Sequence, residues 1–455
     1  MIRRSFASLC FLLLASLPAG AIEIQQVTSP GGVKAWLVED HSIPFTAFTL
    51  MFKGGASLDA PEKRGAINLM TATLEEGAGE MNSTQFAQKI EELGADVNFD
   101  VGDDALIVTA RALTDNRDEV ADVLKTALTT PRFDQEAIDR VRSQVELAIR
   151  SENTDPSSIA AKEMARQAWG DHPYGSSING TLETVGKLTR DDLLDAKNRV
   201  LARDRVLVSA AGDITGAELG ALLDKVLGDL PATGTAPLPQ PAKLGLTGGT
   251  TVIDWDSPQT IVSFAQAGLP MSDPDYFSAY VANFILGGGG FSSRLMDEIR
   301  EKRGLTYGVS TTLDNGLYGD LWRGGMASAN DKVAEAVELT KTEWDRMAQG
   351  VTEKELDNAK TYLTGEYPLR FDGNSKISGI LAGMQLVGLP ADYVNTRNAK
   401  IEAVTADDVK RVAARMLHSP DLRFVLVGRP VGVAGASATT ASDAAPAKEP
   451  EAATN

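Results

Sequence analysis

An arginine and a tyrosine seven residues apart, Arg300 and Tyr307, are the side chains whose types and spacing most suggest chemistry. The segment FSSRLMDEIREKRG predicts a helix with Arg300 near its end, and LTYGVSTTL predicts a strand with Tyr307 near its start. A guanidinium and a phenol that converge there can hydrogen-bond a substrate carbonyl or a developing oxyanion. A helix-end salt bridge and a core-capping tyrosine are the structural alternative, which spacing alone favours.

A run of glycines precedes this helix, and a backbone without side chains lets another chain approach closely. The strand-GxxxxGK[ST] pattern of a phosphate-binding loop is absent, so a peptide contact or a hinge is the better interpretation. The aromatic residue after the run begins the apolar row of the predicted helix, which continues at Leu295 and Ile299. We therefore expect a substrate-binding segment made of Gly287, Gly288, Gly289, Gly290 and Phe291.

The remaining inventory excludes several kinds of active site. The histidines His41, His172 and His418 are not paired at helical spacing, so a zinc site built on two helical histidines cannot form. Cys10 is the single cysteine, and no G-x-S-x-G nucleophile setting occurs, which argues against an independent hydrolase of another kind. The acidic pairs Glu75-Glu76 and Asp103-Asp104 are interpreted as surface residues.

The N-terminus predicts export. Residues 1–21 combine Arg3 and Arg4, an apolar run too short to span a bilayer, and a small-residue cleavage site before Ile22. The mature chain then has 42 basic and 62 acidic residues, a net charge of −20, and no cysteine. This composition predicts a periplasmic protein without disulfides, disfavours nucleic acid and membrane insertion, and suits a basic peptide ligand.

The rest of the chain consists of one α+β unit used twice. LTRDDLLDAKNRVL (188–201) and VTADDVKRVAARML (404–417) share a threonine cap, an acidic first turn and an apolar face. FDQEAIDRVRSQVELAI (133–149) parallels VTEKELDNAKTYLTGEY (351–367) at nearly the same offset. We expect an N-terminal domain at 22–227, a Pro/Gly-rich linker at 228–249, a C-terminal domain at 250–432 and a disordered tail at 433–455.

The Gly-rich run, REKRGLTYGVS, HPYGSSINGT (172–181) and the duplication together resemble the M16 family, the pitrilysin and mitochondrial-processing-peptidase type. The resemblance covers the mature chain to about residue 430. It implies two homologous α/β-sandwich units that form half of a clam-shell. It also implies that Arg300 and Tyr307 contact substrate beside a zinc ion, and that the glycine run handles substrate.

The chain departs from this family at the metal site. Active members carry His-x-x-Glu-His, and alignment on Gly65 places the two histidines on Asn68 and Ala72 and the catalytic glutamate on Thr71. The third ligand falls near Ala148, which cannot bind zinc. We therefore predict no cofactor in this chain and zinc in a partner subunit that carries the intact motif.

Two functions remain open at this stage. In the first, the chain is a non-catalytic subunit of a heterodimeric periplasmic zinc peptidase and supplies Arg300 and Tyr307 to the partner's site for cleavage of unfolded peptides. In the second, it is a catalytically dead peptide-binding or scaffold protein of the same fold. Retention of the arginine–tyrosine pair favours the first.

Overall fold

The computed structural model describes residues 22–433 and 436–439. The predicted signal peptide, 1–21, and most of the predicted tail lie outside these residues. Within them, no helix is long and apolar enough to cross a membrane.

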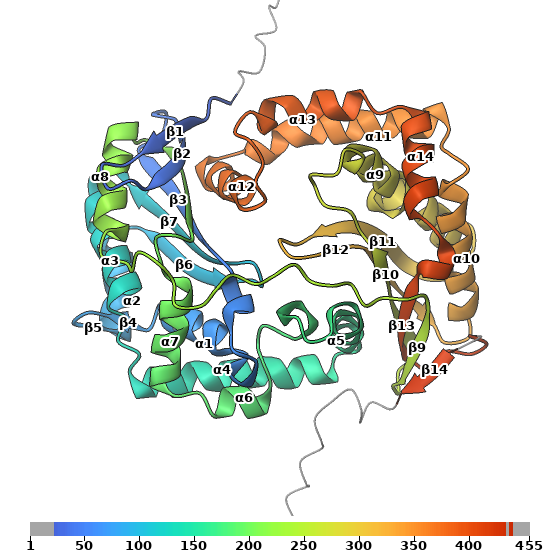
Figure 1. Cartoon of the computed structure of the whole chain (residues 1–455), viewed down its shortest axis with the longest axis horizontal. Coiled ribbons are helices and arrows are strands. Elements are labelled where there is room, and N and C mark those ends of the chain that lie inside the picture. The colour runs from blue at the N-terminus through green and yellow to red at the C-terminus, as the bar shows by residue number, and fades with distance from the viewer. Residues whose placement is uncertain (1–21, 434–435, 440–455) are drawn as a thin grey trace, which may run out of the picture.

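The first unit is a six-stranded sheet with helices on its outer face (Figure 1). Its order is β1-β2-β8-β3-β7-β6, with β2 and β8 parallel and the other pairs antiparallel. The strands are β1 (Gln25–Thr28), β2 (Lys34–Glu39), β3 (Phe45–Lys53), β6 (Asp96–Val101), β7 (Ala105–Leu113) and β8 (Val206–Gly212). A short pair, β4 (Gly77–Ala78) and β5 (Met81–Asn82), stands apart. The helices are α1 (Ala66–Thr73), α2 (Ser83–Glu92), α3 (Arg117–Thr129), α4 (Gln135–Thr154), α6 (Leu182–Gly186), α7 (Arg190–Val200) and α8 (Gly216–Leu227).

The second unit repeats this topology in five of its strands; its sixth, the edge strand β14, comes from the C-terminal end and pairs with β9 in parallel, whereas β1 pairs with β2 antiparallel. Its sheet order is β11-β12-β10-β13-β9-β14, in which β9 and β13 are parallel like β2 and β8. The strands are β9 (Gly249–Asp254), β10 (Gln259–Ala267), β11 (Thr306–Asn315), β12 (Asp320–Ala329), β13 (Arg423–Gly428) and β14 (Ala436–Thr439). The helices are α9 (Tyr276–Asn283), α10 (Val333–Met347), α11 (Glu353–Glu366), α13 (Tyr393–Glu402) and α14 (Ala406–Met416). The predicted α+β class and duplication are confirmed.

Local sequence explains the repeated helices. Thr189 and Thr405 each accept a hydrogen bond from the residue three positions on, whose carboxylate accepts from the threonine N–H in return. These reciprocal bonds satisfy two of the free N–H groups at the start of α7 and α14. Apolar positions then face the two main cores, one under each sheet.

Each unit covers the inner face of the other unit's sheet, which the sequence did not indicate. Helix α5 (Pro156–Trp169) leaves the first unit and packs on β10 and β13, where Ile159 and Met164 share a buried cluster with Val425. Helix α12 (Asn374–Leu386) packs in return on β3 and β8 (Figure 1). Its Ser378 Oγ donates to Thr49 Oγ1 at 2.9 Å, and Ser209 Oγ donates to the Ser378 carbonyl at 2.6 Å.

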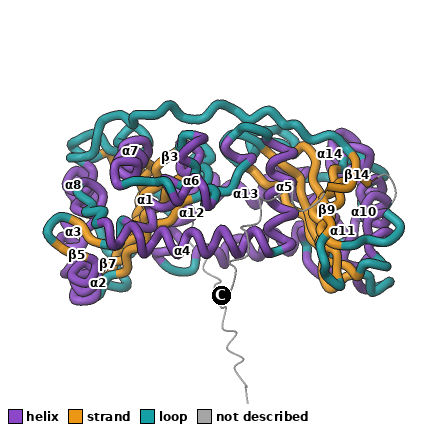
Figure 2. Tube along the Cα trace, turned by 90° about the horizontal axis from the view of Figure 1, so that it is seen from below, coloured by secondary structure: helices purple, strands orange, loops and turns teal. Residues whose placement is uncertain are grey.

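The segment between α8 and β9 crosses the whole molecule. Figure 2 shows it as a long loop that runs over one side from the first unit to the second. Hydrogen bonds fix this loop to the protein: Arg205 Nη2 donates to the Ala236 carbonyl, and Gly245 N donates to the Ala168 carbonyl at 2.7 Å.

The predicted disordered tail is wrong for residues 436–439. These residues form β14, which pairs in parallel with β9 from Ala436 opposite Thr250 to Thr439 opposite Ile253. A tail of small residues offers little to bury, but the open edge of β9 presents backbone groups that any extended segment can pair with. Composition alone could not reveal that edge.

Candidate functional site

The guanidinium of Arg300 lies over the aromatic ring of Phe291. Its Cζ atom is 4.4 Å from the Phe291 ring centroid, in a cation–π contact, and Phe291 is itself 69% exposed. The predicted helix therefore differs from expectation at its start. Phe291 belongs to a short 3-10 turn, Gly290–Ser292, and does not face the core, whereas Leu295 and Ile299 are buried as expected.

The helix that carries Arg300 is a π-helical turn over Met296–Glu301. A second π-helical turn, Phe284–Gly288, begins the glycine run. Such turns are rare and are frequently found at functional sites. Two of them flank the predicted substrate-binding segment, a feature that apolar spacing could not reveal because a π-turn changes the helical period locally.

Arg300 is the cation of its helix end that lacks a strong carboxylate partner. Lys302 and Arg303 both contact Glu298 at 2.6 Å, and these hydrogen bonds lower the pKa of the Glu298 carboxyl. Arg300 Nη1, in contrast, lies 3.5 Å from the Glu301 carboxylate and is buried without a hydrogen-bond partner. A buried donor without a partner is costly, so it is available to an incoming carbonyl or carboxylate.

Tyr307 lies beside this donor with its side chain in solvent. It is 86% exposed, the largest exposure among the large apolar and aromatic side chains of the described chain. Arg300 and Tyr307 line one cavity of about 460 Å³, together with Gln259 and Lys332. The structure thus brings the predicted pair together, and the cavity offers several hydrogen-bond donors to a substrate.

Most of the glycines serve close packing. A Cβ atom on Gly287 would lie 2.5 Å from Thr311 Oγ1, one on Gly288 would meet Asn283 at 2.7 Å, and one on Gly289 would meet the Phe284 carbonyl at 2.8 Å. Gly290 alone has open space and a positive φ of 57°. The run therefore shapes the tight turn that presents Phe291.

An ion pair anchors the start of the same helix. Arg294 Nε and Nη2 donate to the two carboxylate oxygens of Glu355 at 2.7 and 2.9 Å. Burial by itself would raise the pKa of Glu355, but these bonds and those from Thr352 lower it to about 2. The segment from Phe291 to Arg300 is thereby held against α11.

The degenerate metal positions on α1 have taken structural roles. Thr71 is buried and its hydroxyl donates to the Ile67 carbonyl of its own helix at 2.7 Å. Asn68 Nδ2 donates to Asn179 Oδ1 at 2.7 Å, and Ala72 is exposed. Ala148, at the position of the third ligand, lies on α4, and the nearby Glu146 is 3.8 Å from Arg150 of that helix. These residues do not fit a zinc ion, and the described chain holds no group of three His, Cys, Asp or Glu side chains that could bind one.

The length of β11 separates Arg300 and Tyr307 from a contact between the two units. The loop after β11 contacts the first unit, where Leu317 N donates to Asp104 Oδ2 at 3.0 Å and Tyr318 N donates to the Tyr174 hydroxyl at 3.2 Å. Tyr307 is at the other end of this ten-residue strand, about 30 Å away. Arg300 and Tyr307 therefore lie at the end of the second unit remote from that contact.

This contact also corrects the interpretation of Asp103 and Asp104 as surface acids. Asp104 accepts a hydrogen bond from the Tyr174 hydroxyl, and Arg64 Nη2 contacts Asp103 at 2.9 Å. Burial raises the pKa of Asp103, and burial beside Asp104 raises the pKa of Tyr174. His172 caps the same turn and its Nε2 is 3.1 Å from the Gln240 carbonyl. A single sequence gives no sign that the units meet here.

Known proteins agree with this architecture. Residues 34–182 match the family description "Insulinase (Peptidase family M16)", and residues 187–363 match "Peptidase M16 inactive domain". A protein of Helicobacter pylori named "Non-peptidase homolog YmxG" is 27% identical over 90% of this chain and 95% of its own. The mitochondrial-processing peptidase subunit beta of Neurospora crassa is 24% identical over 82% of this chain and 81% of its own.

Solved structures share the fold. A peptidase M16 inactive domain from Pseudomonas fluorescens has a TM-score of 0.84 and 27% identity, over 90% of this chain and 98% of that one. A protease from Helicobacter pylori has a TM-score of 0.81 at 16% identity, over 90% of this chain and 100% of that one. With the duplicated sheets and both matches adjoining along the sequence, the chain belongs to the M16 peptidase family.

Proposed function

We propose that this chain is the non-catalytic subunit of a two-chain periplasmic M16 zinc peptidase and that it supplies Arg300 and Tyr307 to the partner's active site. The proposal is supported by Arg300 Nη1, which is buried without a hydrogen bond and lies no nearer than 3.5 Å to the Glu301 carboxylate, and by the exposed Tyr307 that lines the same cavity. A close ion pair, such as those of Lys302 and Arg303 with Glu298, would have engaged Arg300 internally, whereas its longer approach to Glu301 leaves Nη1 able to bind a substrate oxygen.

The position of the pair supports an action in trans. The chain's own α1 offers no zinc-binding group within the described residues, and the pair lies at the end of β11 remote from the contact of Leu317 and Tyr318 with the first unit. A partner with an intact His-x-x-Glu-His helix would hold the zinc, which supplies the activated water. This chain's share is to orient the peptide and to donate hydrogen bonds to the scissile carbonyl as its oxygen gains charge.

The charge of the mature chain indicates the kind of substrate. A net charge of −20 attracts cationic, extended peptides and speeds their encounter with the complex. The predicted signal peptide at residues 1–21 supports a periplasmic location for this activity.

The test is reconstitution with an M16 chain that carries the zinc motif, by co-purification, zinc analysis and a quenched fluorescent peptide. We expect no activity from either subunit alone, activity from the pair, and a loss of about 10²-fold in kcat with Tyr307→Phe or Arg300→Ala. The control, Tyr362→Phe, changes an exposed tyrosine of the same unit and should retain activity. Zinc and hydrolysis in the lone chain would refute the proposal. A partner fully active by itself would favour the peptide-binding or scaffold function.

A further inference from the structure

The two exchanged helices end in equivalent places, and only one of these places is filled. Gln167 near the end of α5 contacts Thr251 Oγ1 at 3.1 Å, and Gln385 near the end of α12 contacts the Val208 carbonyl at 2.8 Å. Thr251 on β9 and Trp36 on β2 occupy matching positions. Each pairs with the residue three positions before the glycine that ends the neighbouring parallel strand, β13 or β8.

The chain itself fills the place at the end of α5. Residues 242–248 run there as an extended segment in which alternate residues turn inward. Gly245 N donates to the Ala168 carbonyl at 2.7 Å, and Arg423 Nε donates to the Thr247 carbonyl at 2.9 Å. Leu244 and Leu246 pack against Trp169 and its neighbours. An extended peptide is therefore what this site accommodates in the second unit.

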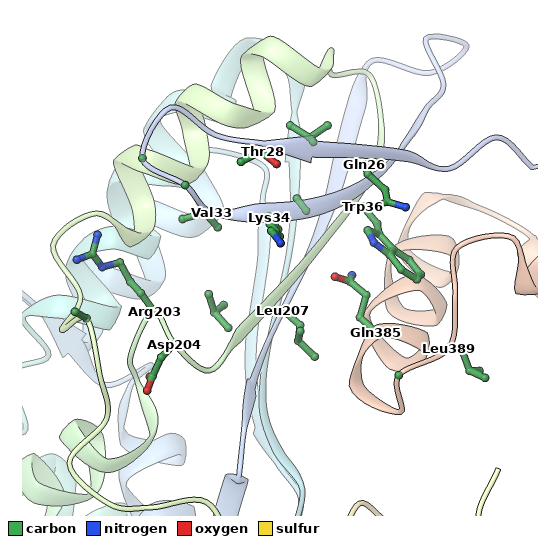
Figure 3. A pocket seen from close by; sticks show the side chains of 17 residues that line it. Gln26, Thr28, Val33, Lys34, Trp36, Arg203, Asp204, Leu207, Gln385 and Leu389 are labelled. Atoms are coloured by element: carbon green, nitrogen blue, oxygen red, sulfur yellow. The ribbon is translucent and has the colours of Figure 1, made fainter. Parts of the chain in front are cut away.

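The matching place at the end of α12 is an open cavity of about 860 Å³, which we name the β2–α12 pocket. In the first unit, β2 is preceded by β1 and by the turn at Gly31 and Gly32. The segment before β2 therefore supplies no leucine to the pocket, unlike residues 242–248 before β9. Figure 3 shows Trp36, Gln385 and Leu389 at one end of it and Arg203 and Asp204 at the other.

The pocket has an apolar wall and unpaired cations. Lys34 and Arg203 line it, both are exposed, and neither forms an ion pair within the part of the chain that the structure describes. Asp204 is engaged by Gly234 N at 3.2 Å and lies 3.6 Å from Arg205 Nε. Trp36 supplies an aromatic surface beside the α12 cluster. Cations next to apolar side chains suit an extended peptide that carries both leucine-like and acidic residues.

We propose that the β2–α12 pocket binds an extended, acidic peptide segment with apolar side chains at alternate positions, in the manner in which residues 242–248 occupy the equivalent place in the second unit. This site is separate from the Arg300–Tyr307 cavity and does not depend on the function proposed above. It would give the protein a second point of attachment for a partner or a long polypeptide.

The experiment measures fluorescence anisotropy with the mature full-length chain. The probe is a labelled octapeptide with the sequence PAELGLEG, which is that of residues 241–248 with Lys243→Glu and Thr247→Glu. A second octapeptide has both leucines replaced by serine. The variant Lys34→Glu/Arg203→Glu reverses the pocket cations without touching the core. Its matched control, Lys354→Glu/Lys410→Glu, makes the same charge change on exposed positions elsewhere.

We expect saturable binding below about 0.1 mM, a Kd raised at least about tenfold by Lys34→Glu/Arg203→Glu, and a change within about twofold for the control. The serine peptide should bind at least about tenfold more weakly. Hydrogen exchange should slow at residues 26–36 and 385–389 when the first peptide binds. Absence of binding, or equal binding by the charge-reversed variant, would overturn the proposal. Loss of binding in Tyr307→Phe would also overturn it, because the peptide would then occupy the other cavity.

Discussion

The two units of this protein share the order of their five equivalent strands, but they differ in how their polar side chains are bonded. In the first unit, α1 keeps its place while its polar residues at the zinc positions bond to the protein itself, Thr71 to its own helix and Asn68 to Asn179. In the second unit, Arg300 Nη1 is buried without a hydrogen bond within the described chain, and the Tyr307 side chain is exposed beside it. The fold of the first unit is thus stabilised without a zinc ion. In the second unit, the Arg300 donor without a hydrogen bond marks the candidate site of substrate contact.

The largest predicted effect concerns the mutual covering of the sheets by α5 and α12. A chain cut after Pro239 into residues 22–239 and 240–439 should give two pieces that do not unfold cooperatively alone, because each sheet loses the helix that buries its inner face. Mixing or co-expression should restore one cooperative transition, measured by circular dichroism and calorimetry. Independent cooperative unfolding of either piece would show that the exchange of helices is dispensable.

A single contact of α12 should have the next largest effect. Leu381 is fully buried on α12, so Leu381→Ala should lower the free energy of unfolding by about 3 kcal/mol. Met164 is buried where α5 packs on the second sheet, so Met164→Ala should lower the free energy of unfolding by about 2 kcal/mol. Leu369→Ala is the control, because Leu369 is 74% exposed and its removal should change stability by less than about 0.5 kcal/mol. Urea denaturation measures all three.

The third prediction is a pH dependence at the anchor of the Arg300 segment. Because the pKa of Glu355 is lowered from 4.5 to about 2 in the folded protein, its stabilising effect is present above about pH 4.5 and is lost as the pH falls toward 2. Glu355→Gln should cost about 1–2 kcal/mol at pH 7. The difference from the wild type should shrink on acidification. A difference independent of pH would mean that the ion pair contributes little.

The smallest effect is expected where the units meet. Tyr174→Phe removes the hydroxyl that donates to Asp104 and accepts from Tyr318 N, and should lower stability by about 1 kcal/mol. Tyr362→Phe, at an exposed tyrosine, should change nothing measurable. Equal stability of the two variants in calorimetry would show that this junction is held by packing alone.

Local chemistry was predictable from the sequence, and contacts between distant segments were not. The capped helices at Thr189 and Thr405 and the approach of Arg300 to Tyr307 follow from residues within one turn or one strand. The exposure of Phe291 was missed because π-helical and 3-10 turns break the apolar period. The exchange of α5 and α12 depends on partners more than 80 residues away, which one sequence cannot pair.

The most direct test of the central claim is a photo-crosslink from position 307. The chain carries p-benzoylphenylalanine in place of Tyr307 and is assembled with its zinc-motif partner and a labelled peptide, then irradiated and digested for mass spectrometry. We expect crosslinks to the peptide and to the partner's zinc-binding helix. Crosslinks confined to this chain's own residues, in a complex that cleaves the peptide, would contradict it.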